Sequence, residues 1–256
     1  MSRKRILITN DDGIDADGIK LLESTLEGLG KIFVIAPLQE QSGSSHSLTI
    51  GKPVRLEERD LQHIAIAGTP TDCVLLAHHS LMDKNIDLVV SGINHGYNLA
   101  DDVLYSGTVA AAMEGRLLRY PAIAVSAARD HATIHENSLR FIREYCQMVL
   151  DRGQLSLTSI NLPQGEPLGV RATRLGKRLY KDVVNRSKDA NGEWHLILSG
   201  ELSSIPVEGG DTEAVDSGCI SVTPLHLDLT GFEDIDELGE DILKLPVCAS
   251  FSCEES

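Results

Sequence analysis

RILITNDDG, at residues 5–13, joins a short apolar run to a polar turn and begins the pattern that decides the fold. The next stretch, residues 14–29, has apolar side chains at helical spacing and contains glycine stop signals near its end. Residues 31–36, KIFVIA, return to a short apolar run, which ends at Pro37. The chain therefore starts as strand, helix and strand, which is the repeating unit of a parallel sheet.

The same alternation continues through the first half of the chain. Short apolar runs predict buried strands at 86–90 and 122–125, and helical spacing predicts helices at 70–81, 109–119 and 136–150. Residues 54–67 are typical of a polar hairpin outside the core. Strands that alternate with helices predict an α/β fold, in which helices cover a parallel sheet and the crossovers are right-handed.

After Pro163 the pattern changes to extended segments. Residues 170–173, 194–198 and 219–223 are strand-like, and the loops between them are rich in glycine and acidic residues. We therefore divide the chain into an α/β core at 1–163 and a β-rich C-terminal extension at 164–256. The extension has a strand that returns near 219–224 and an acidic tail, and we expect both parts to belong to one structural unit.

The charge of the chain is negative and unevenly spread. Of 256 residues 38 are acidic and 23 basic, and from Glu201 onward there are 14 acids and a single base, Lys244. The net charge of −15 argues against binding to duplex nucleic acid, because a protein that binds a duplex needs a basic face. No signal peptide and no apolar run of membrane-spanning length is visible, and five cysteines without metal-type spacing suit a reducing compartment. We expect a cytoplasmic protein without a membrane partner.

Three loops that follow predicted strands carry a concentration of polar side chains. In a parallel sheet, ligands bind beyond the carboxyl ends of the strands. The first loop holds Asp11 and Asp12, the second is QSGSSHS at 41–47, and the third is SGINHGYN at 91–98. Adjacent carboxylates repel each other unless a cation or proton neutralises them, and hydroxyl and amide oxygens suit Mg²⁺, Mn²⁺ or Ca²⁺ better than zinc. An ordinary tight turn is the alternative for the first loop.

Ser106-Gly107-Thr108 directly precedes a predicted helix. Free backbone N–H groups at a helix N-terminus bind phosphate, and hydroxyl groups add donors; a plain helix cap is the alternative interpretation. His46 and His95 lie on loops from which each could reach a ligand. The chain contains no GxxxxGK[ST], GxGxxG or GxSxG motif, which excludes a P-loop NTPase and argues against a dinucleotide enzyme and a serine hydrolase.

Seven motifs occur in order along nearly the whole chain, from Ile6 to about Leu227. They read ILITNDDG, APLQEQSGSSHSLT, AGTPTDCV, SGINHGYN, DVLYSGTVAAAMEG, INLP and SVTPLH. In this order they closely resemble the SurE (survival protein E) family of metal-dependent 5′-nucleotidases. The resemblance implies a Rossmann-like catalytic core with a C-terminal extension used in forming dimers and tetramers. It also implies hydrolysis of nucleoside 5′- and 3′-monophosphates and, in some members, of short polyphosphate.

The resemblance also implies roles for residues of these motifs. Asp11 and Asp12 would be catalytic and would bind one Mg²⁺ or Mn²⁺ per subunit together with Ser42 and Asn94, with Ca²⁺ as a substitute in crystals. The phosphate and substrate side would be formed by Asn10, Gly43, Asn98, Ser106, Gly107 and Thr108. The chain departs from the family pattern at Ala100, where glycine is frequent, and at Cys219, where an aromatic residue is usual.

We favour a divalent-metal-dependent phosphomonoesterase acting on nucleoside monophosphates, in which a metal-bound water attacks the phosphoryl group. Two alternatives stay open. One is an aspartyl-phosphate phosphatase with Asp11 as the nucleophile, although adjacent aspartates lack the spacing of a DxD pair. The other is a protein that senses a nucleotide or phosphate without turnover. The chain has no cluster of aromatic residues to bind a base, so Tyr97 and Tyr105 are the candidates.

An apolar run in the C-terminal extension predicts self-association. Residues 194–198, WHLIL, include the only tryptophan and are flanked by polar loops, so as a solvated edge they would promote aggregation. A second copy of the chain could cover them, and the family resemblance points the same way through exchanged C-terminal segments. We expect a homodimer or homotetramer; packing of the run within its own subunit is the alternative.

Overall fold

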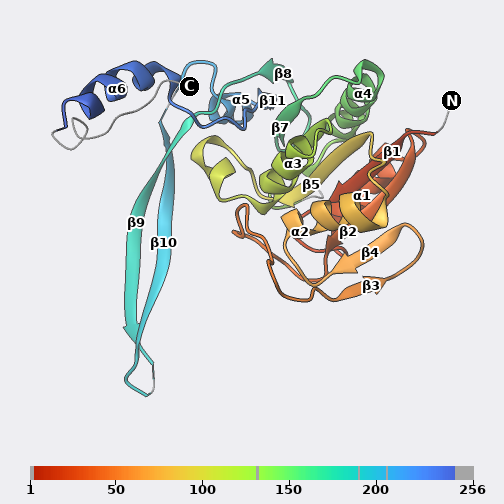
Figure 1. Cartoon of the computed structure of the whole chain (residues 1–256), viewed down its shortest axis with the longest axis horizontal. Coiled ribbons are helices and arrows are strands. Elements are labelled where there is room, and N and C mark those ends of the chain that lie inside the picture. Colours follow the sequence, from red (N-terminus) through yellow and green to blue (C-terminus); the bar gives the residue numbers. More distant parts are fainter. Residues whose placement is uncertain (1–2, 131–132, 190, 206, 246–256) are drawn as a thin grey trace. The chain divides into compact units, whose positions relative to one another are not determined.

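The computed structural model describes residues 3–130, 133–189, 191–205 and 207–245 (Figure 1). Within these ranges, one large sheet is formed by nine strands: β1 Arg5–Thr9, β2 Lys31–Pro37, β3 Leu56–Glu58, β4 His63–Ile66, β5 Leu88–His95, β6 Ala122–Ala127, β7 Leu157–Leu162, β8 Gly169–Ala172 and β11 Cys219–Pro224. Their order in the sheet is β3-β4-β2-β1-β5-β6-β7-β11-β8. The six strands from β4 to β7 in this order are parallel, whereas β3 and β11 each run antiparallel to a neighbour.

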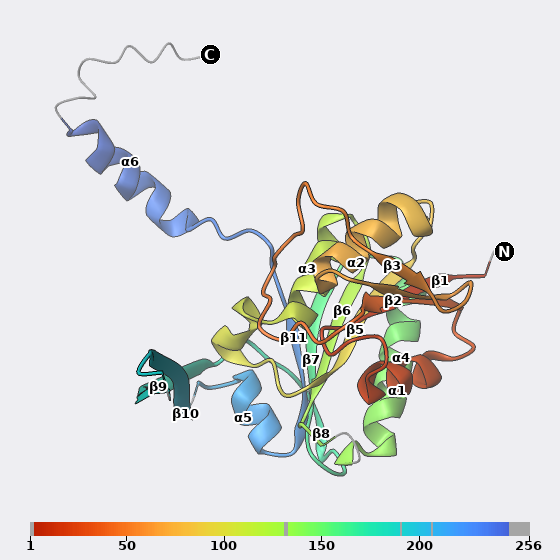
Figure 2. The ribbon, with the colours of Figure 1, turned by 90° about the horizontal axis from the view of Figure 1, so that it is seen from below.

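Helices cover both faces of this sheet (Figure 2). Helices α1 Asp17–Leu26 and α4 Glu136–Arg152 pack together on one face, and α2 Pro70–Leu76 and α3 Gly107–Leu117 pack together on the other. A π-helical turn at Ala77–Leu81 extends α2, so the helix predicted at 70–81 has the expected extent. The predicted α/β architecture, a Rossmann-like and mostly parallel sheet with flanking helices, is confirmed.

The central strands are apolar because they are buried on both faces. In β1 all residues from Ile6 to Thr9 are buried, and Leu7 lies beside Phe33 of β2 and Val89 of β5. On the α3 side, the three alanines Ala110–Ala112 are buried, which lets this helix approach the sheet closely. The loops at the carboxyl ends of the strands therefore start from closely packed, buried strands.

The prediction for residues 54–67 is wrong in one respect. The segment does form an antiparallel hairpin of β3 and β4, but β4 also pairs in parallel with β2 and so belongs to the main sheet. Ile64, Ala65 and Ile66 are buried there. Three apolar residues among charged ones are too few for their pattern to reveal a core strand.

The chain after Pro163 contributes to the same sheet as the first half. Strand β11 pairs antiparallel with β7 and parallel with β8, and α5 Asp211–Asp216 packs against β11. Residues 1–225 form one compact unit and residues 226–256 a second. Of the predicted extension, the part up to Leu225 thus lies in the same unit as the core, and the second unit begins at His226. In this second unit, a short 3-10 turn at Phe232–Asp234 precedes α6 Ile235–Leu243.

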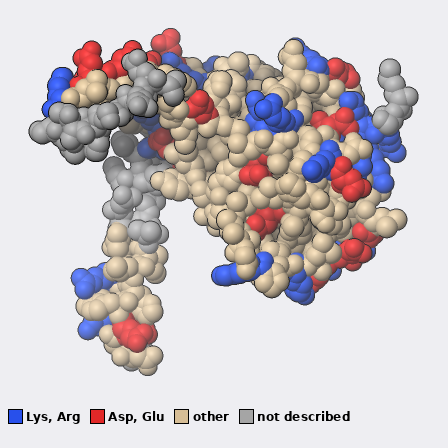
Figure 3. Space-filling model, viewed as in Figure 1, with Lys and Arg blue, Asp and Glu red and all other residues tan. Residues whose placement is uncertain are grey.

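Two long strands form a separate antiparallel hairpin. β9 Lys177–Lys188 and β10 Trp194–Ile205 pair over their whole length, and β9 contacts the 3-10 helix η2, Ala100–Leu104 (Figure 1). The apolar run predicted to be strand-like lies at the start of β10, and Trp194, Leu196 and Ile197 are exposed there. Figure 3 shows charged side chains at the turn end of this hairpin and uncharged surface beside them.

The cysteines behave as the sequence predicts where they are described. Cys73, Cys146 and Cys219 are buried free thiols, and burial raises the pKa of Cys146 to about 12. The described ranges end at Leu245, so Cys248, Cys253 and the acidic residues Glu254 and Glu255 lie outside them. No helix among the described residues is long and apolar enough to cross a membrane.

Candidate functional site

The carboxyl ends of three neighbouring strands carry the candidate side chains. Asp11 and Asp12 follow β1, Ser42 follows β2, and Asn94 lies near the end of β5. Because β2, β1 and β5 are adjacent and parallel, these ends lie at the same edge of the sheet. The structure therefore brings the three predicted loops together.

Asp11 is buried and bound to the start of α3. It is 3% exposed; its Oδ2 accepts a 3.1 Å hydrogen bond from the Thr108 backbone N–H, and its Oδ1 accepts one from the Thr108 hydroxyl. Burial raises the pKa of Asp11 to about 6; the Asp12 carboxylate adds to this rise, while the bonds from Thr108 oppose it. Thr108, for which a phosphate role is expected, is thus also a donor to a candidate metal ligand.

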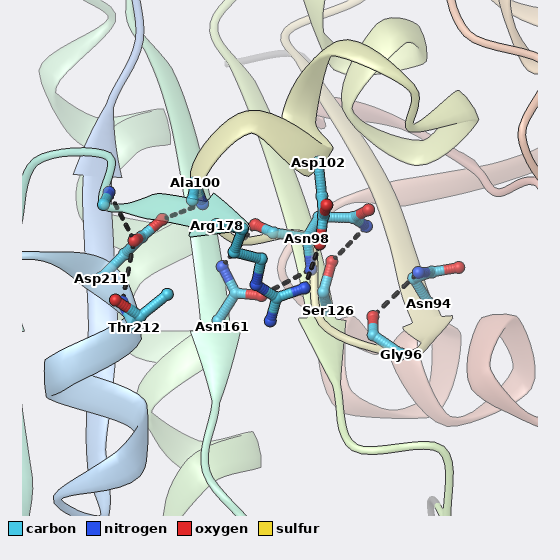
Figure 4. A network of polar contacts seen from close by, with 11 residues as sticks. Asn94, Gly96, Asn98, Ala100, Asp102, Ser126, Asn161, Arg178, Asp211 and Thr212 are labelled. Carbon is cyan, nitrogen blue, oxygen red and sulfur yellow. Dashed lines mark hydrogen bonds and ion pairs between the residues drawn. The ribbon is translucent and has the colours of Figure 1, made fainter. Parts of the chain in front are cut away.

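Asp12 contacts the loop that follows β5. Its Oδ2 accepts a 3.1 Å hydrogen bond from the backbone N–H of His95, and its Oδ1 lies 3.5 Å from His95 Nδ1. The preceding residue, Asn94, donates its side-chain amide to the Gly96 carbonyl at 2.9 Å (Figure 4). Asp12 and Asn94 are therefore held on adjoining segments, and the amide plane of Asn94 is oriented by its own turn.

The loop that carries Ser42 is attached to the first loop through the main chain. The Gln41 N–H donates to the Asp11 carbonyl at 2.7 Å. Ser42 itself is exposed, and its hydroxyl donates to Glu40 Oε1 at 2.8 Å. The Ser42 side chain therefore bonds to its own loop, and the neighbouring residue, Gln41, connects that loop to Asp11.

Farther along, the same loop is fastened to α3 and to the segment before it. The Ser45 hydroxyl donates to the Leu104 carbonyl at 2.7 Å, and the Ser45 N–H donates to the Tyr105 carbonyl at 3.2 Å. His46 Nε2 lies 2.9 Å from Oε2 of Glu114, a residue of α3 that is 7% exposed. His46, one of two histidines that could reach a ligand, is therefore paired with a carboxylate.

The N-terminus of α3 faces Asp11 and the Ser42 loop. The Ser106 hydroxyl accepts a 3.1 Å bond from the Val109 N–H, so this side chain is a helix cap as the alternative interpretation expected. A Cβ on Gly107 would lie 2.7 Å from Ser44 Oγ and 3.0 Å from Asp11, so only glycine allows these three segments to approach this closely. Within the first turn, the Thr108 N–H is bonded to Asp11 and the Val109 N–H to Ser106, so phosphate binding here would depend mainly on the Gly107 N–H.

Asn98 is positioned by two buried polar residues that sequence reasoning missed (Figure 4). Asn161 of β7 accepts from the Asn98 N–H through Oδ1 and donates to the Asn98 carbonyl through Nδ2, both at 3.0 Å. The Asn98 side-chain amide donates to Ser126 Oγ of β6 at 2.8 Å. Asn161 belongs to the INLP motif, and that motif was the one sequence signal that could have singled it out.

The oxygen atoms at this edge suit a hard divalent cation. Two adjacent carboxylates, one of them buried with a raised pKa, are stabilised as anions by a cation. Asn10 Oδ1 and Ser44 Oγ are among the buried oxygens of the described residues that lack a hydrogen-bond partner, and Ser44 lies against the start of α3. The described residues contain no group of three or more His, Cys, Asp or Glu able to hold a metal, so a metal here would depend on hydroxyl and amide oxygens.

The remaining predicted substrate residues differ in their surroundings. Asn10 is fully buried and donates through Nδ2 to the Gly13 carbonyl at 2.8 Å, whereas Gly43 lies at an exposed turn with a φ of +71°. Of the two tyrosines considered for base contact, Tyr105 is 65% exposed directly before the start of α3, and Tyr97 is partly buried. Tyr105 is therefore the better placed of the two for contact with a base.

Comparison with known proteins agrees with the arrangement of these motifs. The family described as Survival protein SurE matches residues 6–182. The 5′-nucleotidase SurE of Gemmatimonas aurantiaca is 47% identical over 88% of this chain and 94% of its own length, and that of Syntrophotalea carbinolica is 44% identical over 91% and 96%. The chain belongs to the SurE family.

The SurE match also holds at the level of the fold. The crystal structure of the SurE protein from Aquifex aeolicus superposes with a TM-score of 0.82, at 37% sequence identity, over 93% of this chain and 99% of that one. The SurE family match includes every residue to which the resemblance gave a role, from Asn10 to Thr108, and it ends within β9.

Proposed function

We propose that this protein is a divalent-metal-dependent phosphomonoesterase that hydrolyses nucleoside 5′-monophosphates to nucleoside and phosphate. The observation that carries the proposal is the contact between Asp11 and the N-terminus of α3. It sets a pair of carboxylates directly beside a helix start, so groups suited to a cation and to a phosphate adjoin each other. Membership in a family whose relatives are called 5′-nucleotidase SurE supports the same substrate class.

Each side chain has a role in this proposal. Asp11, Asp12, Ser42 and Asn94 would hold Mg²⁺ or Mn²⁺, which when bound offsets charge on a phosphoryl oxygen and makes hydroxide available near neutral pH. The first turn of α3 and Asn98 would orient the phosphoryl group, since phosphoryl transfer depends mainly on positioning and charge stabilisation. Asn161 and Ser126 would keep Asn98 in place.

The contacts of Asp11 favour hydrolysis by water over an aspartyl-phosphate route. Both carboxylate oxygens of Asp11 accept hydrogen bonds from Thr108, and the side chain is 3% exposed. Hydrogen bonds lower the nucleophilicity of a carboxylate and hold it in place, whereas each oxygen keeps a second lone pair that can bind a cation. Asp11 is better suited to binding a cation than to attacking the substrate.

A phosphate-release assay tests the proposed function. The protein, stripped of metal with a chelator, is assayed with AMP before and after addition of Mn²⁺ or Mg²⁺. We expect release only with added metal, and nucleoside 3′-monophosphates and short polyphosphate extend the substrate series. Binding of AMP without phosphate release would instead support the sensor alternative, and release that ignores the chelator would contradict metal dependence.

The proposal includes assembly of the enzyme as a homodimer or homotetramer in the cytoplasm. Trp194, Leu196 and Ile197 are 56%, 65% and 58% exposed on β10, which is unusual for large apolar side chains on one short segment. Burial of these side chains against a second copy of the hairpin would remove them from water.

A further inference from the structure

The helix η2 lies between two groups of the candidate phosphate site. It begins two residues after Asn98 and ends two residues before Ser106. Its C-terminal end also accepts both hydrogen bonds from Ser45, so it contacts the loop that carries Ser42. A shift of η2 would therefore displace the phosphate side and the candidate metal side together.

A buried carboxylate from α5 holds the start of η2 (Figure 4). Asp211 is 1% exposed; its Oδ2 accepts from the Ala100 N–H at 2.9 Å, and its Oδ1 accepts from the Gly176 and Thr212 N–H groups, each at 2.8 Å. Ala100 has a φ of +53°, in the left-handed region that favours glycine, which is the residue frequent here in the family pattern. The bond from Ala100 to Asp211 thus helps to hold a strained turn at the entrance to η2.

The same carboxylate binds the residue that precedes the long hairpin. A Cβ on Gly176 would lie 2.9 Å from Asp211 Oδ1, so the close approach requires glycine. Two residues later, Arg178 of β9 forms an ion pair with Asp102 of η2, and the two side chains are only 11% and 13% exposed. The base of the hairpin is therefore connected to η2 both directly and through Asp211.

We propose that Arg178 and Asp211 are positioning residues for phosphate binding, because they fix η2, and with it Asn98 and the first turn of α3, from the base of the β9–β10 hairpin. The inference rests on the proposed function. Neither residue reaches the site itself: Arg178 acts through Asp102, and Asp211 acts through Ala100. Both lie outside the motifs from which the site was predicted.

The ion pair gives the sharper test. Arg178→Gln removes the charge that pairs with the mostly buried Asp102 carboxylate, so we expect η2 to shift. We expect kcat/KM for AMP to fall by about 10- to 100-fold, because a distant mutation that slightly misplaces the groups of a site has an effect of this size. The inhibition constant of inorganic phosphate should rise by a similar factor. Arg178→Lys keeps the charge and should recover part of the loss. In the Asp102→Asn, Arg178→Gln double variant the losses should not add.

A matched control lies on the same side of the molecule. Arg171→Gln breaks an exposed pair between β8 and α5, Arg171 to Glu213 at 3.7 Å, and should leave the kinetics unchanged. Asp211→Asn provides the second variant, because asparagine has a single acceptor oxygen and cannot accept from both the Ala100 and the Gly176 N–H as the two carboxylate oxygens do. If Asp211→Asn fails to fold, the Arg178 series still decides the question.

Amide hydrogen exchange separates this inference from the proposed function. Faster exchange confined to residues 98–108 in Arg178→Gln, with unchanged exchange in the central strands and an unchanged mass in light scattering, supports positioning even if the wild type releases no phosphate. A wild type without phosphatase activity would contradict the proposed function alone. Unchanged exchange and kinetics in a folded Arg178→Gln, or losses of activity that only follow a lowered melting temperature, would overturn the positioning role.

Discussion

Asp11 and Asp12 set two carboxylates side by side at the end of a buried strand. A bound cation would offset the repulsion between them. We expect Asp12→Asn to lower metal-dependent phosphate release more than about 100-fold. Mutation of residues that only support a metal ligand already costs up to about 100-fold, and loss of the ligand itself should cost more. Without metal, the variant should melt no lower than the wild type, since one like-charge contact is removed. Phosphate assays and thermal melts in chelator measure both effects.

The exposed Asp15 supplies a control for that substitution. Its side chain is 78% exposed and lies 3.6 Å from Arg59, away from the candidate ligands, so Asp15→Asn should not change activity. If Asp12→Asn stays within a few-fold of the wild type, Asp12 is not a metal ligand.

Thr108 joins the start of α3 to Asp11 through its hydroxyl, whereas the helix is capped by Ser106. Thr108→Val keeps the volume but deletes the donor to the buried carboxylate. A hydrogen bond to a charged group contributes roughly 1.5–3 kcal/mol, so we expect kcat/KM to fall by about one to two powers of ten. Thr108→Ser retains the hydroxyl and should keep most of the activity. Unchanged kinetics with a lowered melting temperature would support a purely structural hydroxyl.

At the level of elements, apolar periodicity predicted the strands and helices of the first half because these elements are buried on one or both faces. It failed where buried strands are polar. β7, LTSINL, is wholly buried, yet three of its six residues are polar; two of them, Thr158 and Asn161, are accommodated by hydrogen bonds with Tyr145 and Asn98. In β9, KRLYKDVVNRSK, charged residues interrupt the apolar ones so that no run or alternation stands out, and α5 is only six residues long.

The candidate site was predicted as far as its motifs are local. Asp11 and Ser42 lie in loops that follow β1 and β2, Asn94 lies at the end of β5 and Thr108 in the first turn of α3, and strand order places these segments at one edge of the sheet. Asn161 and Asp211 could not be found in this way, since each acts on a backbone group 63 or 111 residues distant. Such contacts are set by long-range packing, which a single sequence does not reveal.

His63 connects β4 to α1 and gives that contact a pH dependence. Its Nε2 lies 2.9 Å from Glu23 Oε1, and its Nδ1 lies 2.9 Å from Asp60. Burial lowers the pKa of His63, but hydrogen bonds and charges from Asp60 and Glu23 outweigh burial, so its pKa is raised. A raised pKa means tighter proton binding in the folded state. The stabilisation is therefore complete below about pH 6.5 and is lost as the pH rises through the folded-state pKa.

Urea unfolding of the wild type and His63→Gln should show this difference. We expect the wild type to be more stable near pH 6 by less than about 1 kcal/mol, because the pair is partly exposed, and this advantage should shrink toward pH 8.5. Glu23→Gln should also be less stable than the wild type near pH 6, because one of the two carboxylates that raise the pKa of His63 is removed. A difference that is constant or grows as the pH rises would contradict the assignment.

On the scale of the whole molecule, charge and apolar surface act in opposite directions on assembly. The segment from Glu201 onward contains 14 acids and one base, so two such segments repel each other. The bases best placed to neutralise them are engaged within their own chain: Arg171 with Glu213, Arg174 with the Glu208 carbonyl and Arg178 with Asp102. In the proposed assembly, attraction between copies would then come mainly from the apolar side chains of β10.

We therefore expect salt to strengthen assembly, because it screens the repulsion and leaves apolar contacts in place. Light scattering should give a mass of at least twice the 27.8 kDa of one chain, with a larger assembled fraction at about 500 mM than at about 50 mM NaCl. The double variant Leu196→Ser, Ile197→Ser changes both faces of β10 and should shift the mass toward one chain. Leu61→Ser, at a side chain 93% exposed beside β4, should not. Dissociation by salt would mean that ion pairs hold the interface, and 27.8 kDa at both salt concentrations would rule out assembly through the hairpin.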